Sequence, residues 1–364
     1  MNAVLYSFYV SQLTCFSGCP GRLARLLQAA GGPEALFRCP EQDLYGLGVP
    51  LRFHEIAMMN AFRDPAKLEA LMEDCERKGI RYIPDGDPAY PERFRVLSDP
   101  PPGIFVKGDV PPTVSPAVAV IGARNCTSYG RDMALFFGQA FGKQGVPVIS
   151  GMAVGIDGYA MRGALSSGGT SFAVLACGAD LCYPRENIDL YHRLPASGGI
   201  LTDKPPGYAG KKYDFPFRNR LISALSDAVI VLEAAMHSGT SITVGYALEQ
   251  GKEVFALPGR VGDRLSDGCN SLLKNGAQVL TAPEDVFQFL GIRVGQDTVK
   301  KRAVSLTKEE KAVADLVGQT PADMETLLEK SAFPLTVLTE VLLRLEIKGV
   351  VTKQALEGYV RVPG

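Results

Sequence analysis

The sequence predicts an α/β protein with three parts: a helical N-terminal domain, a central domain built on a parallel sheet, and a small C-terminal domain. Helical spacing of apolar residues dominates residues 1–75. Between residues 113 and 292, short apolar runs alternate with amphipathic segments, which is typical of parallel strands covered by helices on both faces. After residue 303, three helix-start signals precede two strand-like runs.

The composition is that of a globular protein with no overall affinity for polyanions. Of the 364 residues, 46% are hydrophobic and 21% are charged, which argues against a disordered chain and allows two or three domains. The formal net charge is −1. A polyanionic partner therefore has to be held by a local patch.

The chain carries no sequence signal for export, membrane insertion or metal binding. Its first residues lack a basic segment, and no apolar run is as long as a membrane span. The eight cysteines form no CxxC pair, and the three histidines do not complete a zinc set. We therefore expect a cytoplasmic protein with free thiols, no metal and no cofactor.

The first domain is expected to be helical, of the SAM or helix-hairpin-helix type. Leu23, Leu26 and Leu27 recur at helical spacing, and Gly31-Gly32-Pro33 marks a turn followed by a helix start. Residues 18–21, Gly-Cys-Pro-Gly, are a candidate hairpin. Such hairpins bind DNA backbones through their amides or act as spacers, and the few cations here favour a spacer.

Residues 76–112 form a bridge rich in proline, in which Ile104–Val106 is a candidate strand added to the next domain. Residues 113–292 are expected to form a Rossmann-like domain, because buried strands alternate with helices there. Its candidate strands are Ala117–Ile121, Val146–Ile149, Phe172–Ala176, Ala228–Leu232, Val254–Leu257 and Gln278–Leu280.

Residues 293–302 are polar and form a predicted linker to a winged-helix domain at 303–364. A capping box at Thr307 and Glu310 opens its first helix, and further starts follow at Thr320-Pro321 and Pro334. This domain carries seven Lys/Arg and nine Asp/Glu. Because winged helices that read DNA normally present a basic helix, we favour a protein-interaction or dimerisation role.

Three strand ends carry residues that suit a phosphate. A glycine lets the phosphate approach the backbone, and the following helix offers free N–H groups. Arg124 can grip a phosphate, although a surface arginine on a tight turn is the simpler alternative. The candidates are Gly122 and Arg124 in the first turn, Ser150, Gly151 and Gly155 in the second, and Ser238, Gly239 and Thr240 in the third.

The segment Asp203–Arg220 has a local excess of cations, with five Lys/Arg and two Asp separated by Tyr and Phe. Cations beside aromatic rings are what a groove for single-stranded nucleic acid requires. A solvated loop whose aromatic rings fold back onto the core is the alternative. The candidate contact residues are Lys212, Phe215, Arg218, Asn219 and Arg220.

The sequence contains no recognisable catalytic set. There is no GxxxxGK[ST] loop and no readable pair of carboxylates. Asp157 is interpreted as a helix cap or loop anchor; an acid role stays open, but no partner base accompanies it. His237 adjoins Ser238, yet neighbours in a chain rarely face each other as a catalytic pair. We therefore predict a binding protein rather than an enzyme.

With these residues in view, the chain resembles the DprA/Smf family, the bacterial DNA-processing proteins of natural transformation. The resemblance runs through nearly the whole chain, and its motifs are specific only in combination. They are SGxAxGID at 150–157, YPREN at 183–187, FPxRNR at 215–220, SGTSIT at 238–243, ALEQG at 247–251, EVFALPG at 253–259 and GCN at 268–270.

The resemblance implies a homodimer that binds single-stranded DNA without sequence preference and loads the RecA recombinase onto it. It also implies protection of incoming strands and displacement of single-strand-binding protein. By matching position, Arg124, Lys212, Phe215, Arg218 and Arg220 contact the strand, and the glycine and hydroxyl turns hold its phosphates.

The chain departs from the family pattern at two positions. Met161 stands where histidine is common, and Val154 stands where a polar or basic residue is frequent. The alternative function is a nucleotide-processing enzyme of the lysine-decarboxylase-like phosphoribohydrolase group. Its motif ends in a catalytic glutamate, where this chain has Thr243, so that function is disfavoured.

Overall fold

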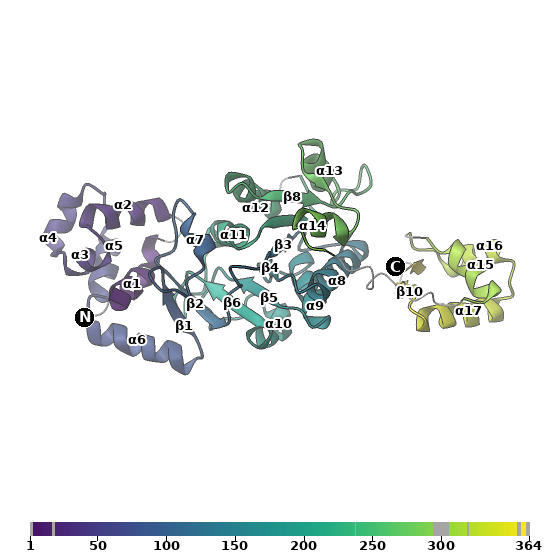
Figure 1. The fold of residues 1–364 in the computed structure, drawn as a ribbon, viewed down its shortest axis with the longest axis horizontal. Coiled ribbons are helices and arrows are strands. Elements are labelled where there is room, and N and C mark those ends of the chain that lie inside the picture. Colours follow the sequence, from purple (N-terminus) through teal and green to yellow (C-terminus); the bar gives the residue numbers. More distant parts are fainter. Residues whose placement is uncertain are drawn as a thin grey trace. The chain divides into compact units, whose positions relative to one another are not determined.

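The computed structural model describes residues 3–16, 19–236, 238–293, 306–318, 320–354 and 358–361. It divides into two compact units, residues 1–293 and 294–364 (Figure 1). The α/β fold class predicted from the sequence is confirmed. The finer boundaries near residues 75 and 112 and the linker at 293–302 remain predictions.

The N-terminal part of the first unit is helical, as predicted. Proline occupies the first helical turn of α2, α3 and α6, where its missing N–H is not needed. Of the predicted hairpin at residues 18–21, residue 18 lies outside the described residues. The helices are α1 (Ala3–Gln12), α2 (Pro20–Ala30), α3 (Pro33–Arg38), α4 (Glu41–Leu44), α5 (Phe53–Ala61) and α6 (Pro65–Arg77).

The central element of the described chain is a nine-stranded sheet in the order β1-β2-β6-β5-β4-β3-β7-β8-β9. The strands from β6 to β9 in this order are parallel, whereas β1 and β2 are antiparallel additions. The strands are β1 (Arg81–Pro84), β2 (Gly103–Gly108), β3 (Val118–Ile121), β4 (Val148–Ser150), β5 (Ser171–Val174), β6 (Gly198–Thr202), β7 (Ala228–Val231), β8 (Glu253–Ala256) and β9 (Gln278–Val279).

All six predicted central strands are present, and the predicted added strand is β2, which pairs with β6. Strands β1 and β6 were not predicted from the sequence. Strand β6 begins with two glycines, which disfavour strands in general. They are required here because a Cβ on Gly199 would lie 2.0 Å from the Asp109 carbonyl oxygen of the neighbouring segment.

Helices cover both faces of the sheet (Figure 1). On one face α8 packs against α9, and Phe141 of α8 contacts Phe287 of α14 with ring centroids 5.8 Å apart. On the other face, α11, α12 and α13 share one hydrophobic core with strand residues such as Ala119 and Val229. The helices are α7 (Glu92–Arg95), α8 (Ser128–Lys143), α9 (Ile156–Ser166), α10 (Ile188–Arg193), α11 (Asp214–Leu225), α12 (Gly239–Glu249), α13 (Asp267–Lys274) and α14 (Pro283–Phe289).

Helix α1 joins the helical part to the edge of the sheet. It is buried along almost its whole length. The hydroxyls of Ser7 and Ser11 lie 2.8 and 2.7 Å from the Tyr82 hydroxyl on β1. Phe8 packs edge-on against Tyr82 and Phe105, with centroids 5.0 and 5.8 Å apart. The N-terminal helices and this edge of the sheet therefore share one hydrophobic core.

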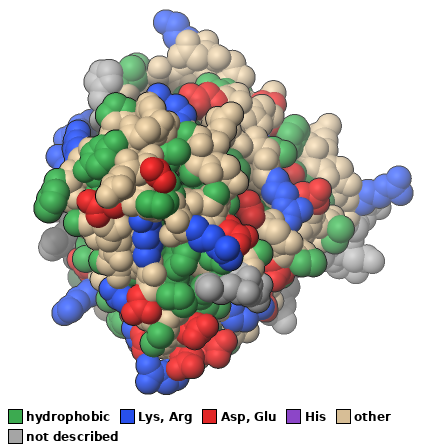
Figure 2. Space-filling view, turned by 90° about the vertical axis from the view of Figure 1, so that its left-hand side faces the viewer, with side chains coloured by type: hydrophobic (Ala, Val, Ile, Leu, Met, Phe, Trp, Pro, Cys, Tyr) green, Lys and Arg blue, Asp and Glu red, His purple; other side chains and the backbone are tan. Residues whose placement is uncertain are grey.

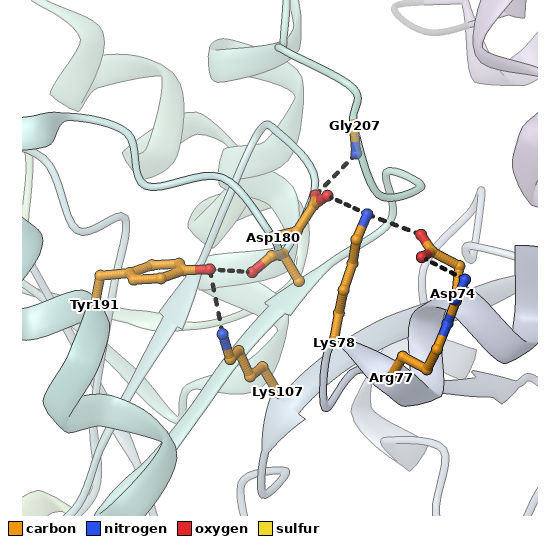
Figure 3. A network of polar contacts seen from close by, with 8 residues as sticks. Asp74, Arg77, Lys78, Lys107, Asp180, Tyr191 and Gly207 are labelled. Carbon is orange, nitrogen blue, oxygen red and sulfur yellow. Dashed lines mark hydrogen bonds and ion pairs between the residues drawn. The ribbon is translucent and has the colours of Figure 1, made fainter.

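A polar network makes a second connection beside α6 (Figure 3). The Lys78 ammonium lies 2.8 Å from Asp74 and 3.0 Å from Asp180, which follows β5. Asp180 in turn accepts a hydrogen bond from the Gly207 amide at 2.8 Å. The network therefore links α6 to two loops of the α/β part. On the face that carries the N-terminal helices, cations and carboxylates are interspersed (Figure 2).

The second unit has the predicted winged-helix pattern in its described residues. Its elements are α15 (Lys308–Leu316), α16 (Met324–Ser331), α17 (Leu335–Ile347), β10 (Val351–Gln354) and β11 (Gly358–Arg361). The capping box is confirmed: Thr307 and Glu310 exchange hydrogen bonds of 3.2 and 2.8 Å. The predicted second start at Thr320-Pro321 is wrong, because Asp323 caps α16 by accepting from the Thr326 amide.

Candidate nucleic-acid interface

A cavity of about 430 Å³ lies at the point where the sheet reverses its order. From β3 the chain proceeds through β4, β5 and β6 on one side, and β7, β8 and β9 lie on the other. In such sheets ligands bind beyond the carboxyl ends of the strands at this switch point. The cavity is lined by residues 121–124, Ala153, Asp157, Phe215, Pro216, Arg218, Asn219, Ile222, residues 238–240, Ile242 and Thr243.

The turn after β3 places Gly122 and Arg124 at this cavity, as the sequence suggested. A Cβ on Gly122 would lie 2.7 Å from Ile156 and 2.9 Å from the Glu233 carbonyl oxygen. The glycine therefore lets the turn pack against α9. Arg124 is exposed, and within the described residues it makes no ion pair. Its guanidinium is available to a ligand in the cavity.

In the turn after β4, the predicted contact residues Ser150, Gly151 and Gly155 do not line this cavity, although Ala153 of the same turn does. The prediction that the Ser150 hydroxyl contacts a strand is wrong, because Ser150 is fully buried and donates to the Val120 carbonyl at 2.7 Å. Gly155 has φ +82, and a Cβ there would lie 2.3 Å from the carbonyl oxygens of Ala123 and Arg124. Gly155 thus lets the second turn hold the first in place.

Gly151 also has a supporting role. Its amide donates to the Asp157 carboxylate at 3.1 Å, and its carbonyl accepts from Arg218 at 3.1 Å. Asp157 is therefore the loop anchor that the sequence suggested. Burial raises the pKa of Asp157 and lowers that of Arg218 to about 10.

The turn after β7 brings Ser238, Gly239 and Thr240 to the start of α12. The first amides of a helix have no partner within the helix, and they favour anions. The Ser238 side-chain oxygen is buried without a hydrogen-bond partner among the described residues. A Cβ on Gly239 would meet no atom within 4 Å, so a ligand has room above the helix end. His237 lies outside the described residues.

The cationic segment of the sequence is a helix rather than a loop from Asp214 onward. Phe215, Arg218 and Asn219 lie on the side of α11 that lines the cavity. Arg218 is only 6% exposed, and its guanidinium donates to the carbonyls of Gly151 and Val174. Arg218 therefore organises the strand ends, and Phe215 and Asn219 are the accessible residues.

The prediction that Arg220 contacts the strand is contradicted by the structure. Its side chain is 4% exposed and lies between two carboxylates, 3.5 Å from Asp99 and 3.5 Å from Asp203. It also stacks over Phe217, 4.2 Å from the ring centroid. Arg220 does not line the 430 Å³ cavity. A half-turn of helix directs it to the opposite side of α11.

Several of the cations in the segment Asp203–Arg220 are thus buried and paired inside the fold. Lys204 is buried, and its ammonium lies 3.1 Å from Asp203, which is also a partner of Arg220. Lys211 and Lys212 are exposed in the loop before α11, but Lys212 does not line the 430 Å³ cavity. Its predicted contact with DNA remains a prediction about the rim.

Tyr183 is a further residue of the candidate site that was not predicted from the sequence. It is 49% exposed, and its ring centroid lies 5.2 Å from that of Phe215 at an angle of 51°. The two rings line a second cavity of about 160 Å³, which shares Arg124, Phe215 and Arg218 with the first. The available signal was the YPREN motif, which begins at Tyr183.

Asn187 of the same motif was also missed. Its side-chain amide donates to the carbonyls of Met152 and Ala153, both at 2.9 Å, and so holds the turn after β4. Of the two departures from the family pattern, Met161 is fully buried in the core, and Val154 lines the smaller cavity. The Met161 departure therefore changes core packing, while Val154 changes the site.

The lining offers binding groups rather than an evident set for hydrolysis. Among the described residues, Asp157 is the carboxylate of the 430 Å³ cavity, and it is engaged by the Gly151 amide. Thr243, at the glutamate position of the phosphoribohydrolase motif, is 3% exposed. The described residues contain no group of three or more side chains suited to a metal, and none of their helices could span a membrane.

Comparison with known proteins assigns the family. The family described as "DNA recombination-mediator protein A" matches residues 81–291, and the "DprA winged helix domain" matches residues 300–355. The chain belongs to the DprA family. The Protein Smf of Escherichia coli K12 is 35% identical to this member over 79% of each chain. The DNA processing protein DprA of Bacillus subtilis 168 is 35% identical over 64% of this chain and 78% of its own.

Two solved DprA structures are similar to this member of the family. The structure from Streptococcus pneumoniae has a TM-score of 0.66 and 29% identity, covering 79% of this chain and 99% of its own. The Helicobacter pylori structure has a TM-score of 0.52 and 30% identity over 58% of this chain and 95% of its own. Its title describes a unique single-stranded DNA binding mode of that protein.

Proposed function

We propose that this protein binds single-stranded DNA without sequence preference in the cavity at the switch point of its sheet. The observation that carries the proposal is the convergence of three groups there: the exposed Arg124, the Phe215 ring and the start of α12. Its relative from Helicobacter pylori is described as a single-stranded DNA binder, which supports the same ligand.

Each group has a distinct part in the proposed mechanism. The α12 amides and the Arg124 guanidinium hold successive phosphates. The paired rings of Phe215 and Tyr183 present a surface on which bases stack, and stacking accepts every base. Sequence tolerance follows because these contacts address phosphates and ring faces. Gly122, Gly151, Gly155 and Arg218 keep the turns in place.

The proposal extends to the role of a recombination mediator. By resemblance to the family, the protein forms a homodimer, loads the RecA recombinase onto the bound strand, and displaces single-strand-binding protein during transformation. The family assignment supports this role. In it the protein acts by binding and handover rather than by catalysis.

The test of the groove is a salt titration of oligonucleotide binding with the Arg124→Ala variant. Loss of one phosphate contact should weaken binding and make the slope of log K against log salt shallower by about 0.7 unit, the value per phosphate for single strands. Arg193→Ala is the matched control, because Arg193 is exposed on α10 and lines neither cavity.

The outcomes separate the alternatives. Equal slopes for wild type and Arg124→Ala would overturn the assignment of the groove. Tighter binding to duplex than to single strands would overturn the choice of ligand. A nucleoside monophosphate hydrolysis assay is run in parallel, and turnover there would favour the phosphoribohydrolase alternative.

A further inference from the structure

A third cavity, larger than the two described above, lies on the other side of α11, away from the proposed groove. Its volume is about 720 Å³, and it lies between the N-terminal helices and the sheet. Cavities of this size at the junction of two parts of a protein commonly bind small organic molecules. Neither the family assignment nor the proposed DNA binding gives this cavity a role.

One wall of this cavity is apolar. Helix α1 contributes Val10, with Leu13 just beyond its end, and α2 contributes Leu23 and Leu27. The hydroxyls of Ser7 and Ser11 also line it, but both are already bonded to Tyr82. This wall therefore favours a hydrocarbon or aromatic body over a polar one.

The opposite end holds a buried guanidinium with unused donors. Arg220 is 4% exposed, and its Nε and Nη1 atoms have no hydrogen-bond partner among the described residues. Nε is 3.5 Å from Asp99, outside hydrogen-bond geometry. A buried donor without an acceptor is costly. An acceptor oxygen in the cavity would relieve that cost.

The charge of this end disfavours an anion. Lys204 and Arg220 line the cavity together with four carboxylates: Asp85, Asp87, Asp99 and Asp203. Lys204 and Arg220 are already paired with Asp203 and Asp99. An incoming carboxylate or phosphate would therefore meet the surplus negative charge at close range. The same surplus distinguishes this cavity from the proposed DNA groove.

We propose that the 720 Å³ cavity is a binding site for an uncharged, amphipathic organic molecule. Its apolar body lies against α1 and α2, and an amide-type or ketone-type oxygen accepts hydrogen bonds from Arg220. The site joins residues of both parts of the first unit. Occupancy therefore stabilises the contact between the N-terminal helices and the sheet.

The test uses two probes of one shape and different charge, 2-naphthamide and 2-naphthoate, with the full chain labelled at leucine and valine methyl groups for NMR. We expect saturable shifts at Val10, Leu13, Leu23 and Leu27. The neutral amide should bind about tenfold more tightly than the carboxylate, because the carboxylate approaches Asp99 and Asp203.

Two substitutions on one helix provide the matched control. Ala24 is exposed on α2 and lines the cavity, whereas Ala29 is exposed on the same helix and does not. Ala24→Trp should fill the cavity and weaken 2-naphthamide binding by about tenfold or more, and Ala29→Trp should leave it unchanged. Single-stranded DNA affinity should stay the same in both variants.

The donor itself is tested with Arg220→Lys, which keeps a cation between the two aspartates but removes Nη1. We expect this variant to bind 2-naphthamide more weakly than the wild type does, and its binding of 2-naphthoate to remain weak. Three results would each overturn the proposal: no saturable shift with either probe, equal affinity for both probes, or full binding in Ala24→Trp. If Arg220→Lys fails to fold, the α2 pair still decides.

Discussion

The two sides of α11 differ in whether the cations beside them are exposed or buried in ion pairs. On one side, Phe215 and Asn219 line the proposed DNA groove, where Arg124 is exposed. On the other side, Phe217 and Arg220 face the 720 Å³ cavity, and Arg220 is buried between Asp99 and Asp203. Residues that are neighbours in sequence thus belong to sites of opposite chemistry.

This difference shows how little a local charge count says about a surface. Five cations fall between Asp203 and Arg220, yet Lys204, Arg218 and Arg220 are all at most 6% exposed. A buried cation is tolerated when carboxylates or carbonyls surround it. The proposed groove therefore relies on Arg124, on helix amides and on aromatic rings more than on the cluster of cations.

The largest expected effect comes from removing the cation on the buried side. Arg220→Met leaves Asp99 and Asp203 with one fewer partner, so the free energy of unfolding should fall by about 3–5 kcal/mol. Urea unfolding measures this loss. Burial by itself would raise the pKa of Asp203, but Lys204 and Arg220 hold that pKa below its usual value.

Lys212→Met is the control for this variant, since Lys212 is exposed and its loss should change stability by about 0.5 kcal/mol at most. Strand affinity of Arg220→Met, measured where the variant is folded, should remain within about twofold of wild type. Unchanged stability together with weak strand binding would show that Arg220 contacts DNA. The proposed difference between the two sides of α11 would then be wrong.

The two phenylalanines of α11 give a second, smaller test of the difference between its two sides. Phe215→Ala removes a ring from the groove and should weaken single-strand binding by about 1–3 kcal/mol, the range for a stacked base. Phe217→Ala removes the ring beneath Arg220 and should lower stability while leaving binding intact. Fluorescence anisotropy and urea unfolding on both variants separate the two effects. If Phe217→Ala weakened binding and Phe215→Ala lowered only stability, the DNA groove would lie on the Phe217 side of α11 instead.

The smallest effect is expected from deleting residues 303–364. The winged-helix unit is acidic overall and forms a compact unit of its own. Strand affinity should therefore change by about twofold or less, as judged by the same anisotropy titration. A collapse of affinity would assign the winged helix to DNA and would show that the groove beside α11 is incomplete alone.

The fold was largely predictable because its signals are local. The six central strands are apolar runs, and the first winged-helix element starts at a capping box, so neither needs distant information. Strand β6 was not predicted, because its two glycines are explained only by the neighbouring segment that passes over them. The start of α16 was misplaced, because Asp323 competes with Thr320-Pro321 as a start signal.

The geometry of the candidate site was predicted in part. The sequence placed the turns after β3 and β7 correctly at strand ends, and both line the cavity. It did not reveal that Ser150 bonds to Val120, because that bond joins two adjacent strands. It also gave no indication that Tyr183 pairs with Phe215, since the two rings are distant in the chain.

The sequence by itself determined the elements, the glycine turns and the presence of a cation-rich segment, since all three are local properties of the chain. Only the tertiary structure decided which cations are exposed. Helix α11 rotates its side chains by about 100° per residue, so burial depends on how the helix is set against the sheet. The partners of Arg220 and Arg218 come from segments that sequence patterns do not connect: Asp99, Asp203 and the carbonyl ends of β4 and β5.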